Sequence, residues 1–372
     1  MSKTIAIIGA SYLQRPLVER AKQMGLRTIC FAWAEGAVCK DICDVFYPVS
    51  ITEKEQILRL CQEEHIDGVC TIASDVAAPT VAYVAQHMGL TGNSYEAALK
   101  ANNKFAMRNA FMAAGVPCPA YRICQSAEQI DPEQMRYPVI VKPTDRSGSL
   151  GITKVTNHED LKAAITTAVN HSFEHEALVE QFIEGREISV EFISYGGKHY
   201  PLQITDKVTT EAPHFVELAH HQPADLTAEQ YQSIYALTEK ALNALDVTNG
   251  ASHAEYKITA QGEIYVMEIG ARMGGDFIGS DLVRLSTGYD FVQGVIQVAL
   301  GSFEQPRQPL HKYAGVYFLS ADTEQVKDYI VHSADYPQIV MAEQTDDTLR
   351  HVTCSSERSG YFIYQADKKF NI

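Results

Sequence analysis

The stretch EIYVMEIGARMGGDF (263–277) predicts a buried strand that ends in a loose, charged turn. The apolar run up to Met267 favours a strand, and Glu268 stands where that strand ends. Arg272 follows four residues later, with Gly270 between the two charges and a glycine pair behind them. An acid and a base at the mouth of a sheet, on a backbone loosened by glycine, indicate a site for a charged ligand.

The preceding residues pair this strand with a second one. GASHAEYKITAQGEIYVMEIG (250–270) reads as a hairpin whose turn includes Gly262. Glu255 and Glu268 are equidistant from the turn centre, so they should face each other across the two strands. Two adjacent carboxylates repel, so one must be protonated or a cation must bridge them. Oxygen ligands of this kind favour Mg²⁺ or Mn²⁺.

Composition narrows the class of protein. The chain has 372 residues, which suggests about two or three domains. Its net charge of −15 repels phosphate backbones, so we expect no nucleic-acid partner. The eight cysteines lack metal-like pairing and favour reduced thiols. We find no signal-peptide pattern and no apolar run near the ~20 residues that span a bilayer, so we expect a cytoplasmic protein with no membrane association.

The N-terminal region, residues 1–95, alternates strands and amphipathic helices. KTIAIIGASYLQRPLVERAKQMGLRTICFAW reads as strand, glycine turn, helix and strand, which predicts a small parallel α/β domain. The turn GASYLQ lacks the second glycine of the dinucleotide fingerprint. We therefore interpret this domain as a scaffold or substrate platform rather than a nicotinamide or flavin site.

The remainder reads as antiparallel sheet with helices. Residues 96–305 contain hairpins, including one at YGGK, and residues 306–372 suggest a small α+β lobe. The predicted fold class is thus mixed α/β and α+β, in three parts.

A glycine- and serine-rich loop follows the strand that ends in Lys142. In PVIVKPTDRSGSLGI, small residues would let backbone amides approach a phosphate; these residues are Ser147, Gly148, Ser149 and Gly151. It is not a P-loop, because the lysine precedes the glycines and no helix opens on G-K-[ST]. A plain hairpin loop is the alternative interpretation.

Another strand end supplies polar groups of a different kind. In LVEQFIEGREISVEF, backbone groups at 180–183 are free to meet the edge of a purine. Glu187, seven residues after Glu180, suits the two hydroxyls of a ribose. Two exposed strand acids are the alternative.

Taken in order, these features resemble the ATP-grasp superfamily of carboxylate ligases. The order is Lys104, Lys142, the small-residue loop, EQFIEGRE and the paired acids that end in EIGAR. The resemblance covers nearly the whole chain. It implies a Rossmann-like domain over 1–95, a split ATP-grasp core over 96–305 and a C-terminal lobe over 306–372.

The resemblance also implies a nucleotide site made of two lysines, a loop and a strand end. The lysines would contact the ATP phosphates, and the loop would close over the β- and γ-phosphates. The strand end would hold the adenine edge, largely by its backbone, and the acid after it the ribose. The two lysines are Lys104 and Lys142, and the loop residues are Ser147, Gly148, Ser149 and Gly151. The residues of the strand end are Glu180, Phe182 and Ile183, and the acid that follows is Glu187.

The metal and catalytic residues are implied in the same way. Glu255 and Glu268 would ligate Mg²⁺ or Mn²⁺, and Arg272 would stabilise the transferred phosphoryl group and the tetrahedral intermediate. Lys207 would be a further phosphate or substrate contact. One departure matters: the superfamily motif usually reads E-x-N-x-R, with the asparagine binding metal, and Gly270 stands in its place. This leaves the number of metal ions open.

The segment APHFVELAHHQPADL resembles the L-amino acid ligase branch, which makes dipeptides of the bacilysin type. On that resemblance three side chains line the substrate pocket and a glycine pair lets the backbone approach the substrate; these are His214, Glu217, His220, Gly274 and Gly275. For the histidines, solvated or capping loop residues are the alternative.

The function implied is an ATP- and Mg²⁺-dependent ligase for small-molecule substrates. A carboxylate would be activated as an acyl phosphate and attacked by an amine, with release of ADP and phosphate. Purine-biosynthetic carboxylases and formyltransferases, other carboxylate–thiol or carboxylate–amine ligases, and a nucleotide-binding module without turnover stay open as alternatives. For assembly, a homodimer is the general expectation.

Overall fold

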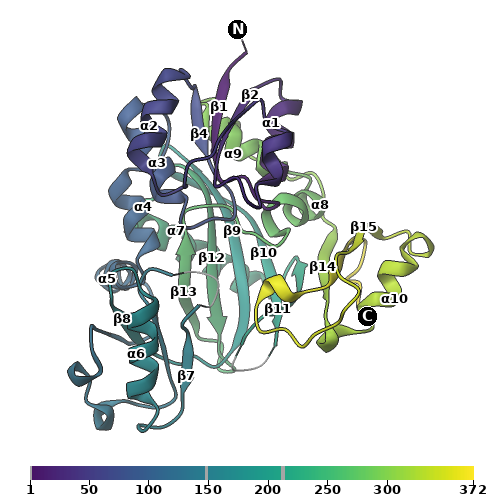
Figure 1. Cartoon of the computed structure of the whole chain (residues 1–372). Helices are drawn as coiled ribbons and strands as arrows, with labels where there is room; N and C mark the ends of the chain where they lie inside the picture. Colours follow the sequence, from purple (N-terminus) through teal and green to yellow (C-terminus); the bar gives the residue numbers. More distant parts are fainter. Residues whose placement is uncertain (1, 147–149, 211–213) are drawn as a thin grey trace.

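The computed structural model describes residues 2–146, 150–210 and 214–372, and it contains three sheets (Figure 1). The first sheet has four parallel strands in the order β3-β2-β1-β4. Its strands and helices are β1 (Thr4–Ile8), α1 (Arg15–Gln23), β2 (Arg27–Phe31), β3 (Val45–Tyr47), α2 (Lys54–Glu63), β4 (Gly68–Cys70) and α3 (Ala78–Met88). Every residue of β1 is buried, as expected for a parallel strand covered on both faces. The predicted parallel pairing is confirmed.

Two helices lead from this region into a second sheet. Helices α4 (Tyr95–Asn102) and α5 (Lys104–Ala114) are capped at their N-termini by Ser94 and Asn103. The side chain of each cap accepts a hydrogen bond from a backbone N–H of the first turn. The second sheet is antiparallel, in the order β5-β8-β6-β7, with helix α6 (Leu161–His171) packed on it. Its strands are β5 (Tyr121–Cys124), β6 (Val139–Pro143), β7 (Thr153–Val155) and β8 (Ala177–Gln181).

The third sheet has eight antiparallel strands and crosses the middle of the molecule (Figure 1). Its order is β13-β12-β9-β10-β11-β14-β16-β15. The strands are β9 (Arg186–Tyr195), β10 (Lys198–Thr209), β11 (Glu217–Gln222), β12 (Gly250–Ile258), β13 (Ile264–Gly270), β14 (Tyr313–Leu319), β15 (Ile339–Gln344) and β16 (Gly360–Ala366). The hairpin predicted at YGGK joins β9 to β10, and both of its glycines have positive φ.

The C-terminal strands continue this central sheet. Strand β14 pairs with β11 over Ala219 to Gln222, and β16 then pairs with β14. The remaining helices are α7 (Ala228–Ala244), α8 (Val283–Thr287), α9 (Phe291–Ala299) and α10 (Val326–Val331). The domain boundaries at 95 and 305 stay a prediction. Within the described ranges, no helix has the length and apolar character that a membrane crossing requires.

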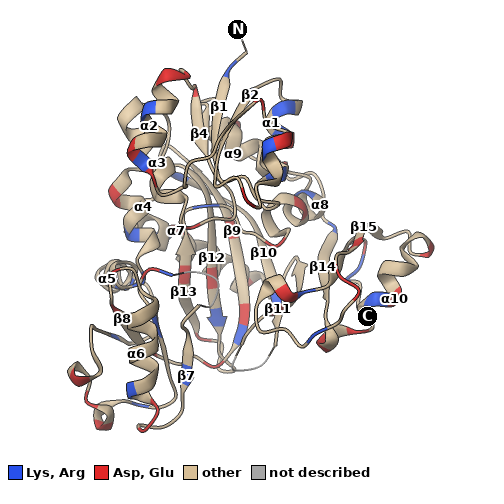
Figure 2. Cartoon of the chain, viewed as in Figure 1, with Lys and Arg blue, Asp and Glu red and all other residues tan. Residues whose placement is uncertain are grey.

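The central sheet has one apolar and one charged face. Helix α7 and helix α5 pack on the face that carries Val190, Ala254 and Tyr256. Residues of opposite parity form the other face: the register pairs Glu187 with Lys257, Ser189 with Glu255, and Glu191 with His253. Figure 2 shows acidic and basic residues together on β9, β12 and β13. This charged face is where the candidate site lies.

Candidate active site

Glu255 and Glu268 are directly opposite each other on β12 and β13, as the hairpin predicted. The ladder has a bulge between Glu255 and Tyr256, so the pairing shifts by one residue at this point. Each carboxylate has its own cation. Glu268 Oε1 is 2.9 Å from Lys104 Nζ, and Glu255 Oε1 is 2.8 Å from Lys207 Nζ. The repulsion between the two acids is therefore relieved by two lysines.

Lys207 lies among three carboxylates. Its Nζ is 2.8 Å from Glu255, 3.0 Å from Glu187 and 3.3 Å from Glu217, and the side chain is 3% exposed. Burial alone would lower the pKa of Lys207, but these acids raise it well above its usual value. Burial would likewise raise the pKa of Glu255, yet Lys207 and His253 hold it well below its usual value. Both groups are therefore charged at neutral pH.

A buried histidine extends this network. His253 Nδ1 is 2.5 Å from Glu191 Oε1, and its Nε2 is 3.5 Å from Glu255 Oε1. Burial opposes protonation, but Glu191 and Glu255 raise the pKa of His253 to about 9. Gly274 donates its N–H to Glu191 at 3.3 Å, and a Cβ there would lie 2.7 Å from His253 Nδ1. The first glycine of the pair thus allows the backbone to lie against this histidine.

A second buried network joins the small sheet to the central one. The Glu180 carboxylate accepts from Arg108 Nε at 2.5 Å and lies 2.6 Å from Lys142 Nζ. Arg108 also donates to the Met267 carbonyl on β13 at 2.6 Å. Burial would raise the pKa of Glu180, but Arg108 and Lys142 keep it below its usual value; burial lowers that of Lys142.

The Glu180 carboxylate is thus occupied by two cations, and its backbone lies within the sheet, paired with Tyr121 on β5 and Ile140 on β6. The backbone N–H groups of Gln181 and Phe182 donate to the Ala120 and Pro138 carbonyls, so the free backbone groups predicted at 180–183 are partly used within the fold.

The other predicted nucleotide residues lie around these two networks. Lys104 Nζ donates to the Arg146 carbonyl at 2.8 Å, which places it between the loop and Glu268. Glu187 meets Lys207 and Lys257, each at 3.0 Å. Lys154 Nζ lies 3.8 Å from the centre of the Phe182 ring, and Ile183 is buried.

The predicted phosphate loop is only partly described. Ser147, Gly148 and Ser149 lie outside the described residues. Gly151 has a φ of +74°, and a Cβ there would lie 3.0 Å from the His171 Cβ. Both the positive φ and the lack of space for a Cβ therefore favour glycine at position 151.

Arg272 is paired with Asp75, an acid in the turn that follows β4 of the N-terminal sheet. Its Nε and Nη2 donate to Asp75 Oδ1 and Oδ2, both at 2.8 Å. Burial disfavours the charged form of both groups. Asp75 nevertheless raises the pKa of Arg272, and Arg272 lowers the pKa of Asp75, so the pair favours the ionised form of each. A Cβ on Gly270 would lie 2.7 Å from Asp75 Oδ1. The place expected for a metal-binding asparagine is thus beside this ion pair.

A cavity of about 730 Å³ opens next to the glycine pair. Gly274 and Gly275 line it, together with Tyr12 from the N-terminal region and Arg358 from the C-terminal lobe. Arg358 Nη1 and Nη2 donate to Asp276 at 2.9 and 2.8 Å, so two opposite charges meet in the wall. The cavity is bounded by segments that lie far apart in the sequence, from Tyr12 to Tyr361.

The two predicted histidines differ in burial. His214 is exposed. His220 is buried, with Nε2 4.0 Å from Asp276 Oδ2, and burial lowers its pKa. Glu217 Oε2 accepts from Ser355 Oγ at 3.3 Å. His220 and Glu217 therefore reach the cavity through Asp276 and Ser355, whereas the two glycines line it directly.

The acids present suit a magnesium ion that is also held by a nucleotide. Among the residues with described positions, no group of three or more histidine, cysteine or acidic side chains is arranged to hold a metal. Mg²⁺ in proteins is commonly held by one or two carboxylates and the phosphates of a bound nucleotide. Glu255 and Glu268 supply two facing carboxylates beside two lysines, so they fit that ligand set.

Several residues of the site were not predicted. On the central sheet, Glu191 and His253 follow the two-residue spacing of Glu187 and Glu255, so the alternation of a strand could have revealed them. Other residues join the site only through tertiary contacts; these are Asp75, Arg108, Asp276 and Arg358. Asp75 does follow β4, at the carboxyl end of a parallel sheet, where ligands commonly bind.

Residues 135–281 match the sequence profile of the ATP-grasp domain. The chain contains an ATP-grasp domain. The matched range of this ATP-grasp domain begins just before β6 and ends beyond Arg272, so it includes Lys142, Lys207 and the facing acids. The resemblance found in the sequence is confirmed.

Two curated relatives share part of the chain. It is 29% identical over 245 residues to the alanine–anticapsin ligase of Bacillus subtilis strain 168, covering 59% of this chain and 51% of the relative. It is 32% identical over 197 residues to the D-alanine–D-alanine ligase of Geobacter sulfurreducens, covering 51% of this chain and 61% of the relative. The chain thus spans between half and two thirds of these relatives' lengths.

The crystal structure of the L-amino acid ligase from Bacillus licheniformis is similar along the whole chain. The TM-score is 0.82 at 23% identity, over 99% of this chain and 94% of that one. This similarity shows a shared fold. The predicted ATP-grasp fold, with helix and sheet in both parallel and antiparallel arrangements, is therefore confirmed.

Proposed function

We propose that the protein is a ligase that uses ATP and Mg²⁺ to join a carboxylate to an amine. The observation that carries this proposal is the facing pair Glu255 and Glu268, each held by a lysine, on the charged face of the central sheet. The cavity beside Gly274 supplies room for organic substrates. The named relatives are ligases, and two of their names specify alanine.

The chemistry has to make a carboxylate electrophilic. In the proposed reaction a carboxylate oxygen attacks the γ-phosphorus of ATP, and the bond to ADP breaks. The resulting acyl phosphate is attacked by the nitrogen of the amine, the carbon–oxygen bond breaks, and phosphate leaves while the nitrogen loses a proton. Charge accumulates on phosphate oxygens in the first step, so positioned cations supply most of the catalysis.

The cations of the site suit that task. Lys104 lies between the loop carbonyl of Arg146 and Glu268, and Lys142 is buried near the end of β6. We assign both to the ATP phosphates and Arg272 to the transferred phosphoryl group. Mg²⁺ held by Glu255 and Glu268 would supply further neutralisation of phosphate charge.

The cavity favours substrates that carry both charges of an amino acid. Asp276 and Arg358 place an acid and a base in one wall, and the aromatic rings of Tyr12 and Tyr361 line it as well. An amino acid has an ammonium, a carboxylate and a side chain that these groups complement. We therefore propose amino acids as the substrate class.

One assay tests the function. The protein is incubated with ATP, Mg²⁺ and pooled amino acids, while phosphate release and product masses are measured. We expect phosphate release that depends on amino acids and a product whose mass is the sum of two amino acids less water. Absence of both would refute the ligase and favour a nucleotide-binding module. Formation of AMP and pyrophosphate would refute the acyl-phosphate route.

A further inference from the structure

Asp75 and Arg272 come from different sheets and meet at the site. Asp75 follows β4 of the N-terminal sheet, and Arg272 follows β13 of the central sheet. The guanidinium and the carboxylate form two parallel hydrogen bonds of 2.8 Å, and both side chains are mostly buried, at 16% and 17% exposed. Such a fork fixes the plane of the guanidinium as well as its position.

The backbone reinforces the same junction. The Ala73 N–H donates to the Met273 carbonyl at 3.1 Å, two residues before Asp75 and one after Arg272. Ala73 has a φ of +55°, an unusual conformation for a residue with a side chain. The segment that carries Asp75 is thus tied to the segment that carries Arg272 through both backbone and side chain.

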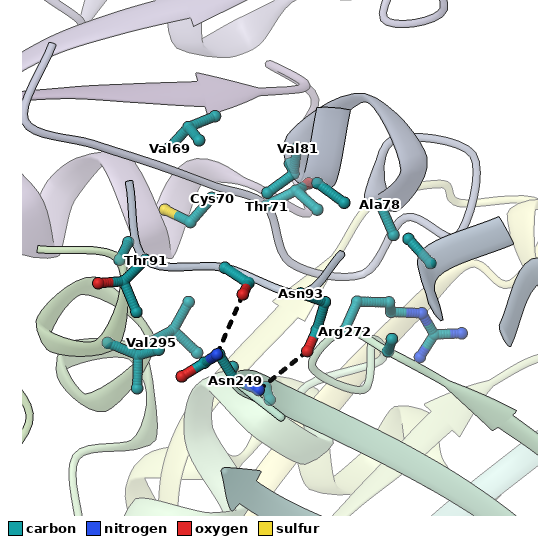
Figure 3. A pocket seen from close by; sticks show the side chains of 18 residues that line it. Val69, Cys70, Thr71, Ala78, Val81, Thr91, Asn93, Asn249, Arg272 and Val295 are labelled. Atoms are coloured by element: carbon teal, nitrogen blue, oxygen red, sulfur yellow. Dashed lines mark hydrogen bonds between the residues drawn. The ribbon is translucent and has the colours of Figure 1, made fainter. Parts of the chain in front are cut away.

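The surrounding interface is fixed as well. A small cavity of about 60 Å³ lies at this interface. Arg272 and Asn93 are among the residues that line it (Figure 3). Across it, the Asn249 N–H donates to Asn93 Oδ1 at 2.9 Å and Asn249 Nδ2 donates to the Gly92 carbonyl at 3.0 Å. Asp75 therefore belongs to a part of the chain that is held against the core by several bonds.

Gly270 makes room for this ion pair. A Cβ at 270 would lie 2.7 Å from Asp75 Oδ1, and 3.1 and 3.2 Å from Arg272 Cζ and Nε. The glycine does not have a φ that requires glycine, so the need for it comes from space. The Asp75–Arg272 pair can therefore take this position because residue 270 has no side chain.

We infer that Asp75 is a positioning residue of the proposed ligase, which holds the Arg272 guanidinium in the space that a side chain at position 270 would occupy. The inference rests on the proposed function, in which Arg272 contacts the negative charge of the transferred phosphoryl group. It gives the N-terminal region an indirect part in the chemistry, because the Asp75 carboxylate acts through Arg272. Gly270 is then a condition for this arrangement rather than a lost ligand.

Chemical rescue tests the positioning role separately from folding. In Arg272→Ala, we expect turnover to fall by about a hundredfold or more and guanidinium at non-denaturing concentrations to restore part of it. In Arg272→Ala/Asp75→Asn, both buried charges are gone, and we expect the rescue to be lost. A structural role for Asp75 would not change how added guanidinium acts. Equal rescue in both backgrounds would overturn the inference.

Single variants provide a second measurement. Asp75→Asn should lower kcat while the KM for ATP stays near that of the wild type, and its loss should be strongly non-additive with that of Arg272→Lys. Glu64→Gln, which breaks the 2.7 Å Arg27–Glu64 pair elsewhere in the N-terminal region, is the matched control and should retain kcat. If guanidinium rescues neither background, additive losses in this cycle refute the positioning role, and non-additive losses support it.

Turnover of the wild-type protein distinguishes failure of the proposed function from failure of the positioning role. If it shows no amino-acid-dependent phosphate release, the proposed function fails. If it turns over, Asp75→Asn keeps the wild-type kcat and Arg272→Ala/Asp75→Asn keeps the rescue, only the positioning role fails. Gly270→Asn adds an independent readout, since we expect its side chain to displace Asp75 and lower kcat to the level of Asp75→Asn. Unchanged turnover in Gly270→Asn would contradict the inference.

Discussion

Glu255 and Glu268 face each other across β12 and β13, yet each carboxylate is neutralised by a different lysine. Lys104 belongs to a helix that precedes the small sheet, and Lys207 belongs to the central sheet. The two halves of the proposed metal site are therefore tied to different parts of the nucleotide site. This arrangement gives the two acids separate functional tests.

Glu268→Gln should weaken the binding of the Mg²⁺ that turnover requires. The substitution removes one of two facing carboxylates and the charge that Lys104 meets at 2.9 Å. We expect the Mg²⁺ concentration for half-maximal rate to rise by about tenfold or more. Glu263→Gln, at the exposed turn of the same hairpin, is the control. An unchanged Mg²⁺ titration would refute the metal assignment of Glu268.

Lys207→Met should destabilise the fold in a pH-dependent way. It leaves three carboxylates facing one another without their shared ammonium, at a cost of roughly 3–5 kcal/mol near neutral pH. The deficit should shrink toward pH 5, because carboxylates released from Lys207 take up protons more readily. Urea unfolding at both pH values measures this, with the exposed Lys198→Met as control. A deficit that does not depend on pH would contradict the network.

Glu180→Gln should reduce the stability of the fold. Its carboxylate pairs with Arg108 and Lys142 in a buried position, so the variant leaves two cations without their partner. We expect a loss of roughly 3–5 kcal/mol in the free energy of unfolding. Glu128→Gln, in the exposed pair with Lys162, should unfold like the wild type. Equal stability of the two variants would refute the structural role of Glu180.

Arg358→Met should raise the KM for an amino acid and leave that for ATP unchanged. Arg358 holds Asp276 in the wall of the cavity with two charged hydrogen bonds, so its loss should cost about tenfold or more in KM. Arg350→Met, which removes an exposed ion pair with Asp346, is the control. A rise in the KM for ATP alone would place the nucleotide, not the amino acid, in this cavity.

The buried His221 should make the folded protein less stable at acidic pH. Burial is the main cause that lowers the pKa of His221 to about 3, and its Nδ1 lies 3.0 Å from the Tyr364 hydroxyl. In the unfolded chain a histidine takes up a proton near pH 6.5. The unfolded state therefore binds the extra proton between about pH 6.5 and 3, and stability falls across that window as the pH decreases.

The variant His221→Gln removes this titration, so its stability should change less over the same window. The exposed His332→Gln should keep the wild-type slope. Denaturant unfolding between pH 7 and pH 4.5 measures both. Equal slopes for the wild type and His221→Gln would contradict the assignment.

Much of the fold was legible in the sequence because its signals are local. The parallel N-terminal strands and the hairpins follow from apolar runs and glycine turns. The pairing of Glu255 with Glu268 was also predicted, although the structure reaches it differently. Ile258 pairs with Ile264, so the hairpin turns half a residue earlier than assumed, and the bulge at Tyr256 restores the pairing of the two acids.

What could not be predicted depends on contacts between distant segments. Asp75 and Arg272 are 197 residues apart, and no spacing rule links them. The space at Gly270 is defined by that pair, so the missing asparagine had no explanation in the local motif. Arg108 likewise joins Glu180 to the Met267 carbonyl only after both sheets are assembled.

The strand order has a practical consequence for anyone who wishes to shorten this protein. The segment 135–281 contains β8 without its neighbour β5, and β11 without its neighbour β14. Excision at those limits would expose two hydrogen-bonding edges, one on each sheet, and would strip the charged face of Lys104 and Asp75. Open edges promote association between chains. A unit for expression and crystallisation should therefore keep β5, β14 and the segments that carry Lys104 and Asp75.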